Sequence, residues 1–588
     1  MTDAAPTPPD FWEEFRRWIY AHFGFLGLAA LASVGLIFYV WTHWEDVKKW
    51  PGVAWLIERF KRQPTPKADP ARFSVMVARL ADDEQGEYAK LIAALLAEFE
   101  GIQILKLDRT IEIEDAGEYA AGHLAARNYL EESAASVLIW GRVLRLDGKK
   151  IPQLYITCSQ GGTASPKQYA IESTQEFRLP PLFWMDMAYV LRFLIFSFDD
   201  RLNEDRGHFV ADRLPEHINR VRYLMTASSD KLAWDSDTRG SIFVMLASAL
   251  RILGDQTGKN QPLEEAIEFY RAAIIEAPRE CTPLRWAMLH INIGVTLQLL
   301  GARGSGTEKL EQSVEAYRTA LLEITQERIP FAWAVTQNNL GNSLHALGEH
   351  VKGTEYFKQA VEAFGETLKV WTREQNPLDW AGTQNNLGNA LLAIGERESS
   401  LDSMKSAVAA YQNTLMEWTR ELVPLEWAMT QNNLGNASLL IGQREADTIQ
   451  LEQAVVAYNN SLLERTRDRS PFDWALTMTN LGNALKALGE LVRGIEFLTQ
   501  ATVIYGKVLN VFTREVFPLQ WAVIQNNLAN TFWIMGEREN RTTLLEQAAA
   551  AYGKALEVFH EAGATHYTEI SQRSLTRVTE LIRERQGK

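Results

Sequence analysis

The chain has 588 residues, too many for one hydrophobic core, and its 46% hydrophobic and 23% charged residues are typical of ordered protein. Its formal net charge of −14 argues against a protein that coats DNA or RNA, because neutralising phosphates needs a basic face. The two cysteines, Cys158 and Cys281, are too few for a disulfide framework and have no Cys or His neighbours at zinc spacing. We expect both to be small buried residues.

Residues 23–41 form an uncharged apolar stretch of 19 residues, which would span about 28 Å as a helix and cross a bilayer once. Aromatic residues flank it on both sides, as at the two headgroup layers of a membrane. A cleaved signal peptide is disfavoured because residues 38–41 are bulky, and a buried core helix would need a surrounding domain. We expect an amphipathic segment at 1–22, a transmembrane helix at 23–41, and a juxtamembrane segment with a proline-rich linker at 42–72.

The positive charges around this stretch indicate its orientation. Arg16 and Arg17 precede it, whereas five lysines and arginines follow it within residues 48–62. Positive charges favour the cytoplasmic side of a membrane. We therefore expect a single-pass protein of a bacterial inner membrane, in contact with lipid through 23–41 and with its C-terminal bulk in the cytoplasm.

Residues 73–175 carry alternating strand and helix patterns. The predicted order is strand 73–80, helix 86–101, strand 102–107, helix 119–133, strand 136–145 and strand 152–158. An Asp147-Gly148 turn joins the last two strands. The order predicts one small α/β domain with helices packed on a mixed sheet.

This order resembles the amino-terminal domain of TolB and its relatives. The residues that carry the likeness are Phe73 to Ala78, Ala125 to Asn128, and Ala135 to Val143 with the strand that returns after it. The resemblance implies a sheet that serves as an interaction module, and it brings no catalytic residue.

Residues 176–235 are expected to be a helical connector. The part from 177 to 198 is very apolar, although Asp186 and Arg192 interrupt it. We interpret it as a buried helix that joins the α/β domain to the following array, with a membrane-surface helix as the alternative. Residues 208–224 have the pattern of an amphipathic helix.

No motif in the sequence supplies catalytic chemistry. Residues 254–260 look superficially like a phosphate loop, but they have three residues between the glycines where four are needed, and Asn260 replaces the magnesium-binding Ser or Thr. The acidic run at 199–205 lacks the ligand spacing of a calcium loop, and none of the ten histidines stands in a metal or nucleophile constellation. We expect no enzyme activity, no cofactor and no metal.

A 47-residue repeat organises the C-terminal half. Tryptophan, proline and glycine recur at this step without one insertion, and the tryptophans are Trp286, Trp333, Trp380, Trp427, Trp474 and Trp521. An aromatic residue that recurs from Tyr270 to Tyr552 adds one earlier copy, so residues 236–564 contain seven repeats. A fixed period over this length predicts a stacked array, closed by a polar capping helix at 565–588.

Within the third repeat the pattern predicts two helices. The first runs from about 331 to 347 and is ended by Gly348. The second runs from about 354 to 374, and Pro377 follows it. We expect the periodic tryptophan to pack between adjacent repeats.

These positions resemble a tetratricopeptide repeat. In the third repeat the carriers are Leu340, Gly341, Leu344, Gly348, Ala360, Phe364 and Pro377. The family period is 34 residues, so this version is 13 longer, which longer helices would accommodate. The Asn-Asn-Leu-Gly string is also similar to kinesin light chains and related adaptors. The resemblance implies a mainly α, right-handed α-solenoid of helix pairs, here preceded by one transmembrane helix and a small α/β domain.

Asparagines recur at three positions of the first helices, although Asn is a poor helix-interior residue. They are Asn338, Asn339, Asn342, Asn385, Asn386, Asn389, Asn432, Asn433, Asn436, Asn480, Asn483, Asn526, Asn527 and Asn530. In the tetratricopeptide family these positions line the concave face, so the resemblance implies a groove whose amides hold the backbone of an extended peptide. The alternative is that some of them bond between adjacent helices and set the stacking.

The same face offers no clamp for the carboxylate of an acidic C-terminal tail. In the family that clamp needs Lys or Arg at a position that here holds Val335, Gly382, Met429, Leu476 and Val523. The sequence therefore favours a membrane-anchored adaptor or scaffold that binds a peptide or protein, and no nucleic acid, in an Asn-lined groove. The alternative is a regulatory or sensory protein whose α/β domain binds a signal and whose array relays it.

Overall fold

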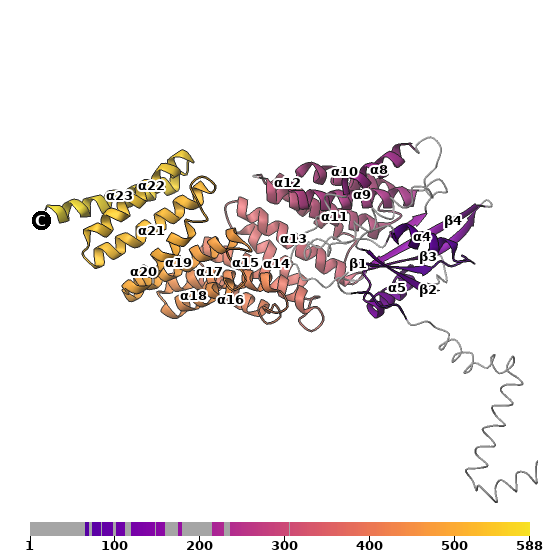
Figure 1. The fold of residues 1–588 in the computed structure, drawn as a ribbon, viewed down its shortest axis with the longest axis horizontal. Helices are drawn as coiled ribbons and strands as arrows, with labels where there is room; N and C mark the ends of the chain where they lie inside the picture. The colour runs from indigo at the N-terminus through magenta and orange to yellow at the C-terminus, as the bar shows by residue number, and fades with distance from the viewer. Residues whose placement is uncertain are drawn as a thin grey trace, which may run out of the picture. The chain divides into compact units, whose positions relative to one another are not determined.

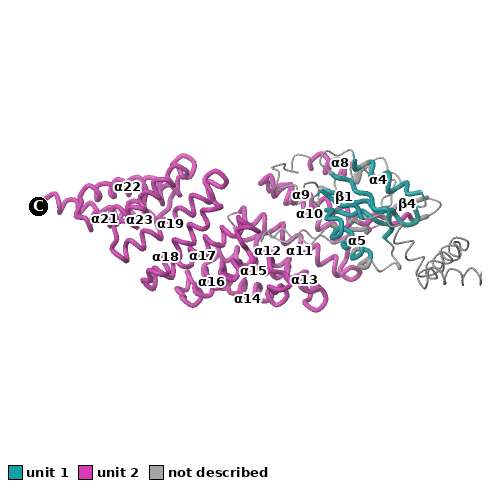
Figure 2. Tube along the Cα trace, turned by 60° about the horizontal axis from the view of Figure 1, so that its bottom comes forward, with its two compact units in different colours: residues 1–141 teal, residues 142–588 magenta. Residues whose placement is uncertain are grey.

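A computed structural model describes residues 65–69, 73–83, 85–97, 102–111, 119–146, 149–158, 175–178, 214–227, 236–304 and 306–587 (Figure 1). The chain divides into two compact units, residues 1–141 and 142–588 (Figure 2). The expected membrane helix at 23–41 lies outside the described residues, as do 1–22 and all of 42–72 except 65–69. Among the helices that the structure describes, none combines the length and apolar character of a membrane span.

Five strands form one sheet in the order β2-β1-β3-β4-β5. The elements are β1 (Phe73–Arg79), α4 (Glu87–Ala97), β2 (Ile102–Thr110), α5 (Tyr119–Ser133), β3 (Val137–Leu146), β4 (Lys149–Cys158) and β5 (Gln175–Arg178). β1 pairs in parallel with β2 and β3, whereas β4 and β5 are antiparallel. The boundary between the two compact units falls inside β3. The first six elements have the predicted order, so a small α/β region with a mixed sheet is present.

β1 lies between β2 and β3 and is buried on both faces. Val75, Met76 and Val77 are at most 2% exposed, and such a continuous apolar run is typical of a strand that is covered on both sides. α5 approaches the sheet at Gly122, because a Cβ there would lie 2.2 Å from Cη2 of the fully buried Trp140. A larger residue at this position would push the helix off the sheet.

The short strand β5 is not predicted by the sequence. Its four residues, Gln-Glu-Phe-Arg, give too brief an alternation to stand out, and Phe177 and Arg178 belong to it rather than to the expected connector helix. Residues 179–213 lie outside the described residues. α8 (Leu214–Ala227) covers the later part of the expected amphipathic helix. The likeness to the TolB domain stays a prediction.

Seven helix pairs and a final helix follow, one pair for each predicted repeat (Figure 1). We number the 47-residue repeats 1 to 7 from residue 236. The pairs are α9 (Ser236–Thr257) and α10 (Asn260–Glu276), α11 (Pro283–Arg303) and α12 (Glu308–Ala320), α13 (Pro330–His350) and α14 (Glu355–Thr367), α15 (Pro377–Glu398) and α16 (Leu401–Thr414), α17 (Pro424–Glu445) and α18 (Thr448–Ser461), α19 (Pro471–Val492) and α20 (Ile495–Val508), and α21 (Pro518–Arg538) and α22 (Thr542–Glu561); α23 (Thr565–Gln586) ends the array.

Neighbouring repeats are joined by helix contacts of two kinds. Each second helix packs on the first helix of its own repeat and on that of the next repeat, and each first helix contacts the next first helix. The mainly helical, repeat-built fold is therefore confirmed. The right-handed superhelix stays a prediction.

The second helices of repeats 2 to 6 are shorter than the sequence predicts. α14 ends at Thr367 instead of near residue 374, and residues 368–376 form successive turns closed by Trp371 N to Thr367 O at 3.0 Å and Asn376 N to Thr372 O at 2.9 Å. The side chain of Trp371 is fully buried in this segment, as are those of Trp418 and Phe512 one and three repeats later. Burying that ring takes precedence over local helix propensity. The residues added to the family period thus lie partly in this turn segment and not in a longer second helix.

Gly348 lies inside α13 and does not end it. The helix continues to His350, and a Cβ at Gly348 would lie 2.8 Å from Cε1 of Phe357. The glycine is therefore needed for the close approach of α13 and α14. Cys281 also differs from expectation, because it is exposed in the turn between α10 and α11.

The periodic tryptophans are half-buried, and an arginine covers four of the rings. The guanidinium Cζ of Arg373 lies 5.9 Å from the ring centroid of Trp380, and Arg373 Nε lies 2.6 Å from Glu417 Oε1 in the next repeat. The pair of Arg420 and Trp427 repeats this arrangement. The tryptophan thus contributes to the joint between repeats through its arginine, in a less buried setting than Trp371.

A second glycine position brings the two helices of each internal repeat together. A Cβ at Gly388 would lie 2.6 Å from Cε1 of Tyr411. Glycine occupies this position in the five internal repeats, whereas the end repeats carry Ala247 and Ala529. An end repeat has one neighbouring repeat and can shift to accept a methyl group, but an internal repeat is held on both sides.

Gly388→Ala should therefore lower the free energy of unfolding by about 1–3 kcal/mol, because the added methyl group forces α15 and α16 apart. Gly365→Ala is the matched control, since a Cβ there meets nothing within 4 Å and alanine is favoured in a helix by about 1 kcal/mol. Urea unfolding followed by circular dichroism measures both. Equal stabilities of the two variants would contradict the close-approach explanation.

Candidate functional site on the asparagine face

The predicted asparagines lie on one side of the first helices. At about 100° per residue, Asn432, Asn433 and Asn436 fall within one arc of about 100° on α17, whereas Leu434 and Ser438 lie on the opposite side. We call the side formed by the fourteen predicted asparagines the asparagine face. It lies where consecutive first helices contact each other.

Asparagines of adjacent repeats bond to one another across this contact. Asn433 Nδ2 donates to Asn389 Oδ1 at 3.1 Å and to Asn385 Oδ1 at 3.5 Å. One repeat later, Asn480 Nδ2 donates to Asn436 Oδ1 at 3.1 Å, and Asn527 continues the series. A chain of amides therefore links the first helices of repeats 4 to 7.

In repeats 4 to 7, a tyrosine of the second helix donates a hydrogen bond to the third asparagine. The hydroxyl of Tyr411 donates to Asn389 Oδ1 at 2.8 Å, and that of Tyr458 donates to Asn436 Oδ1 at 2.8 Å. Tyr505 and Tyr552 repeat this bond. Burial raises the pKa of each of these tyrosines, to about 12 for Tyr552, so the hydroxyl stays protonated and remains a donor.

The first asparagine of repeats 3, 4 and 7 accepts a hydroxyl from the repeat or capping helix that follows, whereas Asn432 of repeat 5 accepts from the amide of Asn480. Thr430 Oγ1 lies 3.3 Å from Asn385 Oδ1, and Ser571 of α23 lies 2.8 Å from Asn526 Oδ1. Four asparagines are fully enclosed between the helices: Asn338, Asn339, Asn385 and Asn432 are 2%, 0%, 1% and 9% exposed. These four side chains belong to the stacking of the repeats, and a ligand cannot reach them in this packing.

The remaining asparagines are half-buried, and the third one of each repeat still has an open donor. Asn389, Asn436 and Asn483 use Oδ1 for the bonds from tyrosine and from the next asparagine. In the part of the chain that the structure describes, their Nδ2 atoms have no protein partner and are not enclosed. Because Oδ1 already accepts two bonds, Nδ2 is the atom of each amide that can still donate a hydrogen bond.

Sequence reasoning missed the tyrosine partners, although a signal was present. Tyrosine follows the third asparagine by 22 residues in repeats 4 to 7, whereas repeat 3 has Phe364 opposite Asn342. The recurrence of an aromatic residue indicates packing, but it does not reveal a partner for the hydroxyl. Among the described residues, no cluster of His, Cys, Asp and Glu could hold a metal ion.

Two segments match the family model of the tetratricopeptide repeat, residues 380–415 and 521–562. Each begins at the periodic tryptophan and ends at or just after its second helix, in repeats 4 and 7. Repeats 4 and 7 are thus similar to tetratricopeptide repeats. No curated protein matches the sequence.

Solved structures with similar arrays include the apo form of RapI, with 12% identity, a TM-score of 0.39, and coverage of 68% of this chain and 99% of that one. A Rap protein complexed with competence and sporulation factor matches with 11% identity, a TM-score of 0.29 and the same coverage. A circular tandem repeat protein matches with 16% identity, a TM-score of 0.23, and coverage of 68% of this chain and 97% of that one. Because these TM-scores are low, they assign no function.

The tyrosine hydroxyls should contribute measurably to the stability of the repeat array. Tyr458→Phe leaves Asn436 without its buried donor and should lower the free energy of unfolding by about 1 kcal/mol. Phe364→Tyr offers Asn342 the hydroxyl that repeat 3 lacks and should raise the free energy of unfolding by a similar amount. Urea unfolding of both variants checks the pair. A loss in both would show that Asn342 is not placed like its counterparts.

Proposed function

We propose that the chain is a non-enzymatic adaptor whose tetratricopeptide array binds an extended peptide or protein segment along the asparagine face. The supporting observation is the row of Nδ2 donors on Asn389, Asn436 and Asn483, each on an amide whose Oδ1 is held by two hydrogen bonds. An amide that is already held in place loses little conformational freedom when a ligand binds. The row is thus prepared to donate hydrogen bonds.

The spacing of the row suits a peptide backbone. Packed helices lie about 8–10 Å apart, and an extended chain rises about 3.3 Å per residue, so neighbouring donors would meet carbonyl groups about three residues apart. Carbonyl groups are the same at every residue, so this contact is tolerant of side-chain sequence. The four enclosed asparagines would then set the spacing of the row without touching the ligand.

The triple variant Asn389→Asp, Asn436→Asp and Asn483→Asp tests this function. Aspartate keeps the oxygen that accepts from tyrosine but replaces the Nδ2 donor with an acceptor, so partner capture from native membranes should be lost. Asn459→Asp, on the exposed side of α18, is the control and should leave capture unchanged. Equal capture by the triple variant, with an unchanged unfolding midpoint, would refute the proposed binding face.

We also propose that residues 23–41 anchor the chain in a bacterial inner membrane with the array in the cytoplasm. The support is the length of the uncharged stretch and the excess of Lys and Arg after it. Protease added to right-side-out spheroplasts should leave residues 70–588 intact. Cleavage of this part in intact spheroplasts would show that it lies outside the cytoplasm. Recovery of the chain in the soluble fraction would exclude the anchor.

A further inference from the structure

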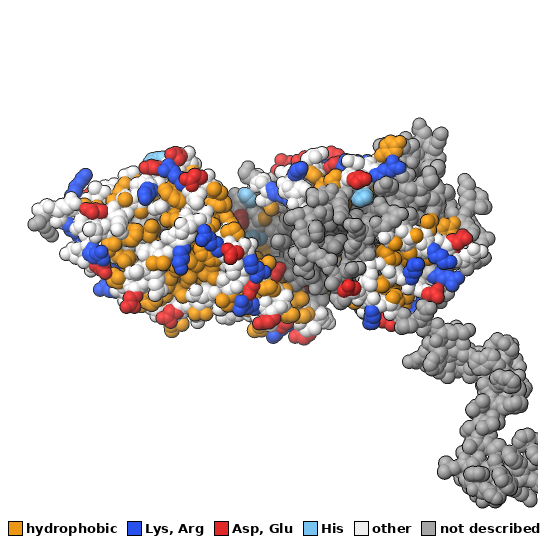
Figure 3. All heavy atoms as spheres, in the orientation of Figure 1, with side chains coloured by type: hydrophobic (Ala, Val, Ile, Leu, Met, Phe, Trp, Pro, Cys, Tyr) orange, Lys and Arg blue, Asp and Glu red, His pale blue; other side chains and the backbone are white. Residues whose placement is uncertain are grey.

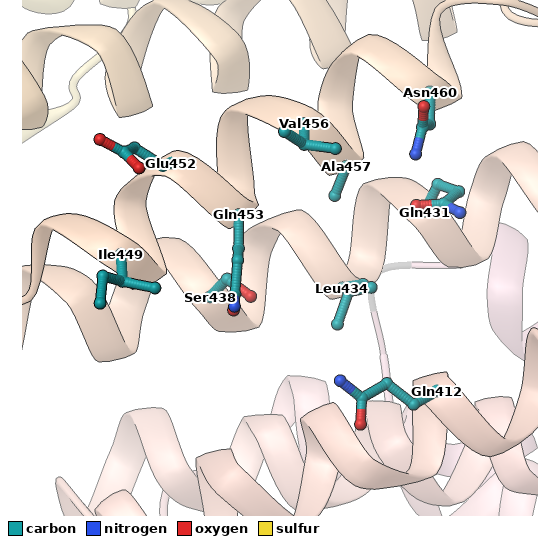
Figure 4. A pocket seen from close by; sticks show the side chains of 10 residues that line it. All are labelled: Gln412, Gln431, Leu434, Ser438, Ile449, Glu452, Gln453, Val456, Ala457 and Asn460. Atoms are coloured by element: carbon teal, nitrogen blue, oxygen red, sulfur yellow. The ribbon is translucent and has the colours of Figure 1, made fainter.

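A groove lies between the second helices α16 and α18, on the side of α17 opposite the asparagine face (Figure 4). Its volume is about 480 Å³. It is lined by Gln412 of α16, by Gln431, Leu434 and Ser438 of α17, and by Ile449, Glu452, Gln453, Val456, Ala457 and Asn460 of α18. We call it the α16–α18 groove. It runs along α18 from Ile449 to Asn460, which is about 16 Å of helix.

Its floor departs from the repeat pattern at Ser438. The equivalent position holds a large apolar residue in every other repeat: Leu250, Leu297, Leu344, Leu391, Leu485 and Phe532. Leu344 and Leu485 are 2% and 5% exposed, so this side chain normally fills the space between the two helices of a repeat. The small serine is one of the lining residues of the groove in repeat 5, and it is itself 1% exposed.

The rim also departs from the repeat pattern, because exposed apolar residues stand where other repeats have acidic ones. Ile449 is 62% exposed, whereas the equivalent residues are Glu308, Glu355, Asp402 and Glu496 in four other repeats. Val456, 59% exposed, stands where repeats 1 to 3 have glutamate. On the face seen in Figure 3, hydrophobic side chains gather over the part of the array from α15 to α20. A cavity and two exposed apolar side chains thus meet at one place, where the solenoid itself needs neither.

Glu452 adds a charge to this rim. It is exposed, and within the described residues it has no ion-pair partner. The equivalent Lys405 and Lys358 in the two preceding repeats each pair with a glutamate of the next repeat, at 2.8 Å and 2.6 Å. The remaining polar lining is made of uncharged amides and Ser438. The groove therefore presents one negative charge to whatever covers it.

We propose that the α16–α18 groove binds an amphipathic helix of a partner protein, separately from the asparagine face. The helix places a large aliphatic or aromatic side chain into the groove, contacts Ile449 and Val456 with residues spaced i, i+4 and i+7, and brings a lysine or arginine to Glu452. The length of the groove matches about three turns of helix.

The test uses the full-length chain and a displayed library of random 16-residue peptides, with counter-selection against Ser438→Leu. That variant restores the residue found in five other repeats, so it should fold and fill part of the groove. Enriched peptides should carry large apolar residues at helical spacing together with Lys or Arg. They should bind Ile449→Glu and Glu452→Lys at least about tenfold weaker than wild type, which corresponds to about 1.4 kcal/mol. The control Val503→Glu, an exposed apolar residue outside the groove, should bind them normally.

Three results would overturn the proposal. The first is no enrichment on wild type over Ser438→Leu, and the second is enrichment of peptides without helical spacing or basic residues. The third is self-association of the wild-type chain that Ser438→Leu abolishes, since the occupant would then be a second copy. The triple aspartate variant of the asparagine face should still bind the selected peptides, so failure of one site is distinguishable from failure of the other.

Discussion

The contact between a first-helix glycine and a second-helix aromatic ring sets the geometry of every internal repeat. At Gly388 the missing Cβ lets α15 lie against the ring of Tyr411, and the hydroxyl of that ring then reaches Asn389. Packing and polar order therefore depend on the same side chain. A wider helix pair would lose the contact and would also draw the hydroxyl away from the amide, so the row of Nδ2 donors on the asparagine face depends on this close approach.

Much of the array could be predicted from the sequence because its residues recur at a fixed step. Seven helix pairs and the capping helix follow directly from the positions of Trp, Gly, Pro and the aromatic residue. The ends of the second helices could not be predicted in the same way. Residues 368–376 contain few helix-breaking residues, and what turns the chain there is the burial of Trp371 against other helices. Local propensity carries no information about that contact.

The sequence predicts where the candidate site lies, but it does not predict which side-chain atoms are already bonded within the protein. The unusual frequency of asparagine within helices marks the face, and the structure shows bonds between adjacent first helices, with Asn385 enclosed between them. The peptide groove stays a prediction. Which atom is occupied depends on a tyrosine 22 residues away and an asparagine 44 residues away. Such distances join separate helices, so a single helix pattern cannot reveal them.

The two sides of the first helices differ in how regular they are from repeat to repeat. Positions that repeat in every copy, such as the third asparagine, give a row of equivalent donors that has no reason to prefer one peptide register. A position that changes in one copy, such as Ser438 with Ile449 beside it, marks a single place on the array. Specific recognition needs such a place, because affinity for one partner over another comes from contacts that the other copies do not offer. The regular asparagine face would bind a peptide backbone with little regard to its sequence. The α16–α18 groove would bind particular side chains and would thereby give the array specificity for one partner protein.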